Sequence, residues 1–349
     1  MRTPSLLRFA GHRPLRPTPW LRLGLAAVAS LALWQGVEAA TGRLTHPAYP
    51  QMLRAAHTMQ AATQVARSQR AALGLMAPRA FDPNQTGLLG AEYTDTTTTL
   101  GDPAAKRTAT NPDLAAALVR RIAGLDLPEG SPVLIVLSGS FIGADIAAIV
   151  AVEELGLRPV LVSSLGASMH GATDAELTWL DIEAELRAKG VIRARSLVAL
   201  LGGGASIGGG MSDEGVATLQ AAADRHGVPL LQDADLDRLL ERLLALAEAE
   251  AGAPPRLLVN AGGSVAALGT CIDVALIAPL TQGRGLSCQD GLPGLLVRLT
   301  GQGVPAISLL NMREVAAEWG LPFDPVPMPV VGNNRAVYGM PPAPRAGEG

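Results

Sequence analysis

Residues 131–155 read SPVLIVLSGSFIGADIAAIVAVEEL and join a short apolar run to a longer one through a turn of Ser and Gly. The run Val133–Leu137 is bounded by turn signals, which is typical of a strand buried on both faces. Ala144–Leu155 has the length and composition of a helix. This unit therefore predicts a strand followed by a crossover helix that covers the sheet.

The same alternation continues along the chain. Further strand candidates are Val160–Ser163, Leu197–Leu201, Leu257–Asn260, Val274–Ala278 and Ala306–Leu310. Helix candidates lie between them at Leu177–Ala188, Glu214–His226 and Leu236–Ala251. Strands that alternate with helices predict an α/β fold with a mostly parallel, Rossmann-like sheet and helices on both faces.

The first forty residues differ from the rest, because their arginines precede an apolar stretch and the first acidic residue is Glu38. We expect a basic cytoplasmic segment at 1–20 and a transmembrane anchor at 21–40. This arrangement predicts a single-pass protein of the cell inner membrane, with the bulk of the chain extracytoplasmic. The apolar core is short for a span, and Val37-Glu38-Ala39 resembles a cleavage site, so a cleaved signal peptide and a buried helix are alternatives.

Three further segments are expected. An Ala-rich helix that begins near Pro50 predicts a helical stalk over 41–85. The α/β domain follows at 86–331. The segment 332–349 is rich in Pro and Gly and predicts a loose tail.

Composition limits the classes of function. A net charge of -3 gives no basic surface for nucleic acid, and 48% hydrophobic residues suffice for a packed core. Cys271 and Cys288 could pair in an oxidising compartment, although two buried free thiols are the simpler interpretation. There is no CxxC and no cysteine cluster, so we expect no metal. There is also no GxxxxGK[ST], no HExxH and no dinucleotide fingerprint, so we expect neither an ATP-driven ligase nor a dehydrogenase, and no cofactor.

Three glycine-rich loops follow predicted strands, at Leu137–Gly143, Gly202–Gly210 and Asn260–Ser264. Ligands of open α/β sheets bind beyond the carboxyl ends of the strands, and helix N-termini there favour anions. The candidate ligand-binding residues of these loops are Ser138, Gly139, Ser140, Gly203, Gly204, Gly262, Gly263 and Ser264. Each loop taken alone could equally be a tight turn.

Ser140 is also a candidate nucleophile, since hydrolases often place one on a strand-to-helix turn. Its surroundings do not match G-x-S-x-G, because Ser138 and Ile142 replace the two glycines. Candidate bases are His170 and His226, and candidate orienting acids are Asp181 and Glu183. A hydroxyl that binds ligand or caps the helix is the alternative role.

Two other clusters are candidate ligand-binding residues. Lys106 and Arg107 precede a predicted helix and could grip a carboxylate, although such a pair is usually only solvated. Trp179, Asp181 and Glu183 could flank a pocket, or Trp179 could be a core contact of its helix.

Several multi-residue motifs resemble the poly-γ-glutamate system protein family. They comprise Leu88–Thr94 with Thr97-Thr98, Ala105-Lys106-Arg107-Thr108, Asn111-Pro112, Ser138–Phe141, Ser163–Ser168, Thr178–Glu183 and the segment Gly202–Gly210. The resemblance covers roughly residues 45 to 330. It implies a single-anchor membrane protein of the machinery that makes and exports poly-γ-glutamate, and it supplies no reaction and no catalytic residue.

Two functions follow as expectations. The first is a membrane-anchored accessory protein that binds poly-γ-glutamate, another anionic ligand or another subunit of the system through its glycine-rich loops. The second is an extracytoplasmic hydrolase or transferase that acts on the γ-glutamyl amide, with Ser140 as its nucleophile.

Overall fold

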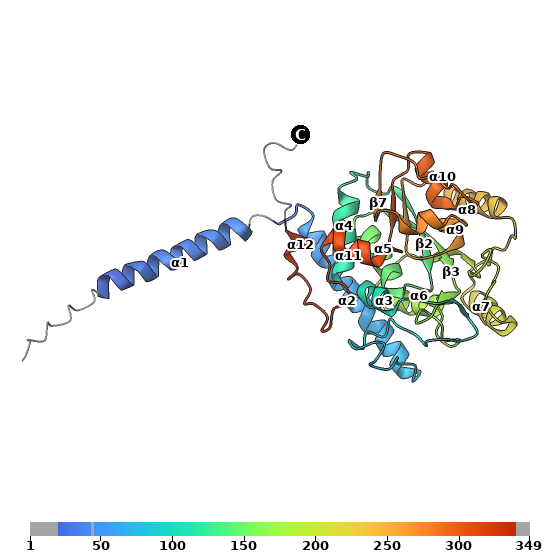
Figure 1. The fold of residues 1–349 in the computed structure, drawn as a ribbon, viewed down its shortest axis with the longest axis horizontal. Helices are drawn as coiled ribbons and strands as arrows, with labels where there is room; N and C mark the ends of the chain where they lie inside the picture. Colours follow the sequence, from blue (N-terminus) through green and yellow to red (C-terminus); the bar gives the residue numbers. More distant parts are fainter. Residues whose placement is uncertain (1–19, 43–44, 340–349) are drawn as a thin grey trace, which may run out of the picture. The chain divides into compact units, whose positions relative to one another are not determined.

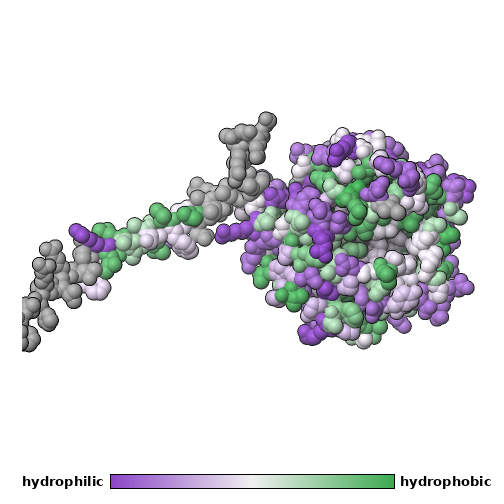
Figure 2. All heavy atoms as spheres, viewed as in Figure 1, coloured by the Kyte–Doolittle hydropathy of each residue, from purple (hydrophilic) through white to green (hydrophobic). Residues whose placement is uncertain are grey.

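A computed structural model describes residues 20–42 and 45–339, which fall into two compact units, Met1–Thr45 and His46–Gly349. In the first unit, helix α1 (Trp20–Gly42) spans the predicted anchor at 21–40, and Figure 2 shows apolar and intermediate residues along it. Among the described residues, no helix is long and apolar enough to cross a membrane. The predicted basic segment at 1–20 lies almost wholly outside the described residues.

The second unit is built on a six-stranded sheet (Figure 1). Its strand order is β5 (Ser196–Leu200), β3 (Arg158–Ser164), β2 (Pro132–Ser138), β6 (Leu257–Asn260), β8 (Ala306–Ser308) and β7 (Leu280–Thr281). Every neighbouring pair is parallel except β7 and β8. The predicted α/β fold with a mostly parallel sheet and flanking helices is confirmed.

The central strand β2 shows why helices cover both faces of this sheet. Val133, Ile135 and Leu137 belong to one apolar cluster, whereas Leu134 and Val136 belong to another. Successive side chains of a strand point to opposite faces, so a strand without polar alternation must be covered twice. The first face is covered by α4 (Asp113–Ala123), α5 (Ile142–Glu154) and α6 (Trp179–Ala188), and the second by α8 (Leu236–Ala251) and α10 (Leu295–Gly301).

Helix α2 (Tyr49–Ala72) lies in the predicted stalk segment 41–85 and packs back on the domain within this unit. Met52, Ala56 and Met59 are fully buried, and the helix packs on α4 and α5. Short side chains along one face let α2 approach its neighbours closely, so the Ala-rich pattern serves this packing.

The predicted loose tail is also partly packed. Helix α12 (Arg335–Tyr338) buries Val337 and Tyr338, and the Tyr338 hydroxyl donates to Asp113 Oδ1 over 2.6 Å. Residues 340–349 of the predicted tail lie outside the described residues.

One predicted strand is wrong, because Val274–Ala278 lies largely in a 3₁₀ helix, η1 (Ile272–Leu276). Leu276 is 74% exposed, so this stretch is not buried on two faces as an inner strand must be. The chain enters the sheet only afterwards, as the antiparallel edge strand β7.

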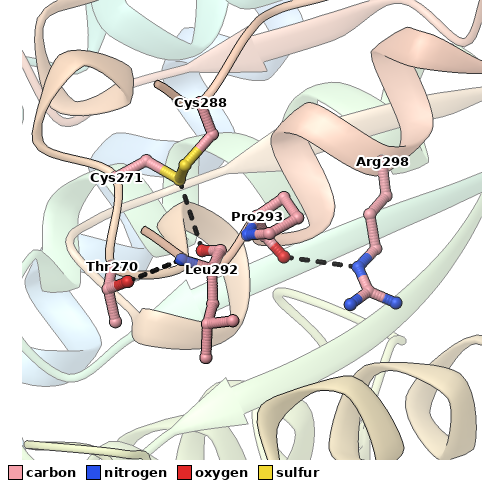
Figure 3. The surroundings of a disulfide bond; sticks show 6 residues. All are labelled: Thr270, Cys271, Cys288, Leu292, Pro293 and Arg298. Atoms are coloured by element: carbon pink, nitrogen blue, oxygen red, sulfur yellow. Dashed lines mark hydrogen bonds between the residues drawn. A yellow bond between two sulfur atoms is a disulfide. The ribbon is translucent and has the colours of Figure 1, made fainter. Parts of the chain in front are cut away.

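Cys271 and Cys288 form a disulfide, which corrects the simpler expectation of two free thiols (Figure 3). The bridge closes a loop with a sequence separation of 17 residues that holds η1 and the β7 segment. Thr270 Oγ1 accepts a hydrogen bond of 2.8 Å from the Leu292 amide beside it.

Removing this disulfide with the double variant Cys271→Ala/Cys288→Ala is expected to lower the free energy of unfolding by about 3 kcal/mol. The unfolded chain regains the conformational entropy that the closed loop denies it. Urea unfolding of oxidised wild type, reduced wild type and the variant checks this. Reduced wild type should match the variant, and an unchanged midpoint in both would contradict a structural role for the bridge.

Candidate functional site

The strand order places a topological switch point between β2 and β6. The chain runs outward from β2 through β3 to β5, and then returns to the other side of β2 as β6. The connections that leave β2 and β6 therefore diverge, which opens a crevice beyond their carboxyl ends. In this chain the residues at that point are Ser138 and Asn260.

A cavity of about 490 Å³ occupies this crevice. It is lined by parts of all three glycine-rich loops, namely Ser138 and Ser140, Gly203 and Gly204, and Gly263 and Ser264. Hydroxyl groups dominate its polar lining, with Thr98, Thr99, Ser138, Ser140, Ser164, Ser168 and Ser264. The structure thus brings three separate loops together around one pocket that is rich in hydrogen-bonding groups.

Two of these loops pass so close to neighbouring residues that only glycine fits at the point of contact. A Cβ on Gly262 would lie 2.6 Å from Ser138 Cβ, so the third loop can reach the end of β2 only without a side chain there. Gly203 has φ +65°, and a Cβ on it would lie 2.2 Å from Gly209 O. The second loop can therefore fold back on itself because Gly203 adopts a positive φ and has no side chain to clash with Gly209.

The end of β2 is held by a buried carboxylate. The Ser138 amide donates to Asp145 Oδ1 over 3.0 Å, and Asp145 lies in the first turn of α5 with no exposed surface. Burial raises the pKa of Asp145 well above its usual range. This contact ties the turn that carries Ser140 to the start of α5.

A fourth wall comes from the Thr-rich segment, which sequence reasoning did not place at the site. Strand β1 (Thr97–Thr99) pairs in parallel with β4 (Ala167–Ser168), outside the main sheet. This small sheet holds Thr98, Thr99 and Ser168 at the cavity. Segment 94–99 has β propensity but little apolar content, which indicates an accessory pairing more than a core strand.

Lys106 lies beneath the cavity on α3 (Pro103–Ala109) and is only 3% exposed. Its Nζ donates to Ser168 Oγ over 2.9 Å and to the Ser140 carbonyl oxygen. Burial lowers the pKa of Lys106 to about 7, against the opposing pull of the Asp145 and Asp102 carboxylates. The lysine therefore contacts two of the residues that line the pocket and is itself almost wholly buried.

The charged residues that line the cavity are Arg313 and Asp102, both exposed. Asp102 caps α3: its Oδ1 accepts a hydrogen bond of 2.9 Å from the Ala104 amide. Part of its negative charge is therefore balanced by the start of its own helix. Phe141, the N-cap residue of α5, and Met312 and Arg313, the first residues of α11 (Met312–Trp319), also line the cavity. Helix N-termini carry partial positive charge, so the pocket favours a negatively charged ligand.

Four of the predicted ligand-binding residues lie elsewhere. Arg107 forms an ion pair of 2.6 Å with Asp324, and Trp179 is fully buried with its Nε1 donating to Ser163 Oγ. Asp181 forms the capping box of α6 and binds Arg225 and His226, while Glu183 accepts from the Ser196 amide inside the fold. These four side chains serve packing and helix capping. The sequence alone does not tell such a role from ligand binding, because both use the same residue types.

Two predicted loop residues stand just behind the cavity. Gly139 lies against Leu165 O, where a Cβ would be 2.6 Å away, and Gly262 lies against Ser138. Neither lines the cavity, and both let their loops approach it. Lys106 belongs with them, since it acts on the pocket from below.

The Ser140 hydroxyl has no imidazole partner among the described residues that line the cavity. Ser140 Oγ accepts from the Ser168 amide over 2.9 Å. His170 is buried against the Phe81 ring, with 4.5 Å between ring centroids, and His226 binds Asp181. His226 is thus engaged by Asp181, whereas the buried ring nitrogens of His170 have no hydrogen-bond partner within the described chain, and neither imidazole lines the cavity.

The sequence signal for the missed residues was weak. Ser164 is the last residue of β3 and Ser168 lies in β4 shortly after it, while Asn311 and Arg313 follow β8, so both pairs lie near the carboxyl ends of parallel strands. Their place after parallel strands is the same signal that the glycine-rich loops carry, because ligands of such sheets bind at this edge. Among the described residues, no cluster of His, Cys, Asp and Glu could hold a metal ion.

Comparison of the chain with protein-family models and with curated proteins gave no match.

Proposed function

We propose that this protein is an exported accessory component of a poly-γ-glutamate system, and that its cavity binds a carboxylate-bearing ligand such as the end of the polymer. The observation that carries the proposal is the convergence of three glycine-rich loops and two helix N-termini on one hydroxyl-lined pocket. The proposal also rests on the motif resemblance. A polymer of γ-linked glutamate offers free carboxylates to such a pocket, while a neutral ligand would leave the helix ends unmatched.

Export is proposed from two independent features. Disulfides persist in oxidising compartments, and Cys271 pairs with Cys288. Arginines followed by an apolar stretch in residues 1–40 are typical of a segment that directs export to or across the inner membrane. A subunit of the same system is the other partner that fits this location.

The proposal is tested by isothermal titration of the full-length protein with γ-linked glutamate oligomers. Binding should weaken as salt rises, because the pocket attracts carboxylates partly through charge. α-Linked oligomers of equal length and charge are the control for linkage. Equal binding of both would reject specificity for the γ-linked polymer, and no binding of either would reject the ligand.

Arg313→Ala is expected to weaken binding of a γ-linked oligomer by roughly 5-fold, equivalent to about 1 kcal/mol. Arg313 is the one cation among the cavity-lining residues of the described chain, and its exposure limits its contribution. Arg284→Ala, at an exposed arginine outside the cavity, is the matched control for net charge. Equal weakening by both variants would assign the effect to overall charge.

The alternative function, hydrolysis or transfer at the γ-glutamyl amide with Ser140 as nucleophile, has less support. Its hydroxyl already accepts a hydrogen bond from the Ser168 amide, and neither His170 nor His226 lines the cavity. A nucleophile needs a base within hydrogen-bond reach.

A further inference from the structure

The strongest unassigned feature of the cavity is the contact between Ser168 and Lys106. Ser168 lines the pocket, whereas Lys106 is buried directly behind it, with Nζ 2.9 Å from Ser168 Oγ. A serine hydroxyl becomes nucleophilic when a base within this distance can take its proton, and lysine serves as that base in some enzymes.

We propose that Ser168 and Lys106 form a nucleophile and general-base pair that transfers the acyl group of an amide or ester held in the cavity. The inference depends on the proposed function only for the cavity as the site of a carboxylate-bearing ligand. It replaces Ser140 by Ser168 as the reacting serine.

The backbone around Ser168 is fixed before any ligand binds. The Ser168 amide donates to Ser140 Oγ over 2.9 Å, and the Met169 amide donates to Thr99 O over 3.0 Å. The second of these bonds is made to β1, which pairs with β4. The hydroxyl therefore has a set position relative to both the lysine and the pocket, as a nucleophile requires.

The approach of Lys106 to Ser168 depends on a missing side chain. A Cβ on Gly101 would lie 2.9 Å from Lys106 Cε, 3.2 Å from Ser168 Oγ and 2.6 Å from Met169 O. Gly101 itself lines the cavity. Any larger residue there would push the lysine from the hydroxyl or close the pocket above it.

The surroundings of Lys106 allow it to exist without charge near neutral pH. The titratable groups that face the pair are Asp102 at the α3 N-cap, Asp145 of α5 and His170 after β4. The two carboxylates favour the ammonium, but burial outweighs them and holds the lysine pKa at about 7. Burial also lowers the pKa of His170, so that ring is neutral when the lysine is.

The proposed reaction balances within the pair and water. Neutral Lys106 takes the Ser168 proton as Oγ bonds to the acyl carbon, and the resulting ammonium returns that proton to the departing amine or alcohol as the acyl bond breaks. Water then attacks the Ser168 ester, giving a proton to Lys106 that returns to Oγ when the carboxylic acid leaves. No oxidant, reductant or metal enters either step.

The test is labelling of the full-length protein with a fluorophosphonate, in which Oγ displaces fluoride from phosphorus and the proton passes to the base. Peptide mass mapping should find the label on Ser168, at a rate that rises as pH increases through about 7. Lys106→Met, which keeps an unbranched side chain one atom shorter and removes the amine, should label at least ~100-fold more slowly. Ser168→Ala should not label at this peptide.

Label on Ser140, no label on wild type between pH 6 and pH 10, or a flat pH profile would overturn the pair. If Lys106→Met fails to fold, the wild-type pH profile still decides. Titration with γ-linked glutamate oligomers and labelling of Ser168 without any oligomer present are two separate measurements, and together they distinguish the two proposals. Oligomers that bind by titration while Ser168 stays unlabelled reject the pair alone, and a labelled Ser168 without oligomer binding rejects the ligand alone.

Discussion

Arg70→Ala is expected to lower the free energy of unfolding by about 3–5 kcal/mol. Arg70 has no exposed surface and forms an ion pair of 2.5 Å with Asp174, which is itself buried. Its Nε donates to Gly87 O over 3.0 Å and its Nη1 to Leu75 O over 3.2 Å. Truncation leaves the Asp174 carboxylate and both carbonyls without a donor inside the fold, which is the costly way to break a buried ion pair.

Arg54→Ala is the matched control, because Arg54 lies on the same helix α2 and pairs with Glu154 at the surface, where its side chain is 60% exposed. This variant should cost less than about 1 kcal/mol. Denaturant unfolding of both proteins measures the difference. Equal and small costs would mean that α2 does not pack on the domain through Arg70.

Gly263→Leu is expected to weaken ligand binding by at least ~100-fold, about 2.7 kcal/mol, while the fold stays intact. Gly263 lines the cavity, and a Cβ there meets only Leu310 Cδ1 at 3.7 Å, an ordinary contact. A leucine at this position therefore fills space that the ligand needs without a backbone clash. Titration with γ-linked glutamate oligomers measures the loss.

Gly301→Leu controls for the added side chain. Gly301 is exposed at the end of α10, and nothing lies within 4 Å of its ideal Cβ. This variant should bind as wild type does, and both variants should unfold within about 0.5 kcal/mol of wild type. Undiminished binding by Gly263→Leu would place the ligand outside this cavity.

The core strands could be predicted from the sequence because strands that are buried on both faces consist of short apolar runs. Val133–Leu137 and Leu257–Asn260 are short apolar runs between turn signals, and the structure has strands there. Val274–Ala278 has the same local appearance but forms a 3₁₀ helix. Local composition does not reveal which apolar run enters a sheet, since tertiary packing decides that.

The candidate site could be predicted from the sequence only in part, because tertiary packing also decides the role of each polar residue. Glycine-rich loops that follow parallel strands indicate the carboxyl edge of the sheet, and those around Ser140, Gly204 and Gly263 do meet at one cavity. Asp181 and Glu183 looked equally suited to a ligand but cap a helix and bind Ser196. Polar residue type alone cannot separate these roles, because the difference lies in which partner the fold supplies.

The most direct test of the cavity as the ligand site is an amide chemical-shift map of the isotope-labelled protein with γ-linked glutamate oligomers. The shifts are predicted to concentrate at Ser140, Gly204, Gly263 and Arg313, which line the pocket beyond the ends of β2 and β6. Shifts gathered instead around Asp181 and His226, or none at saturating oligomer, would contradict the account.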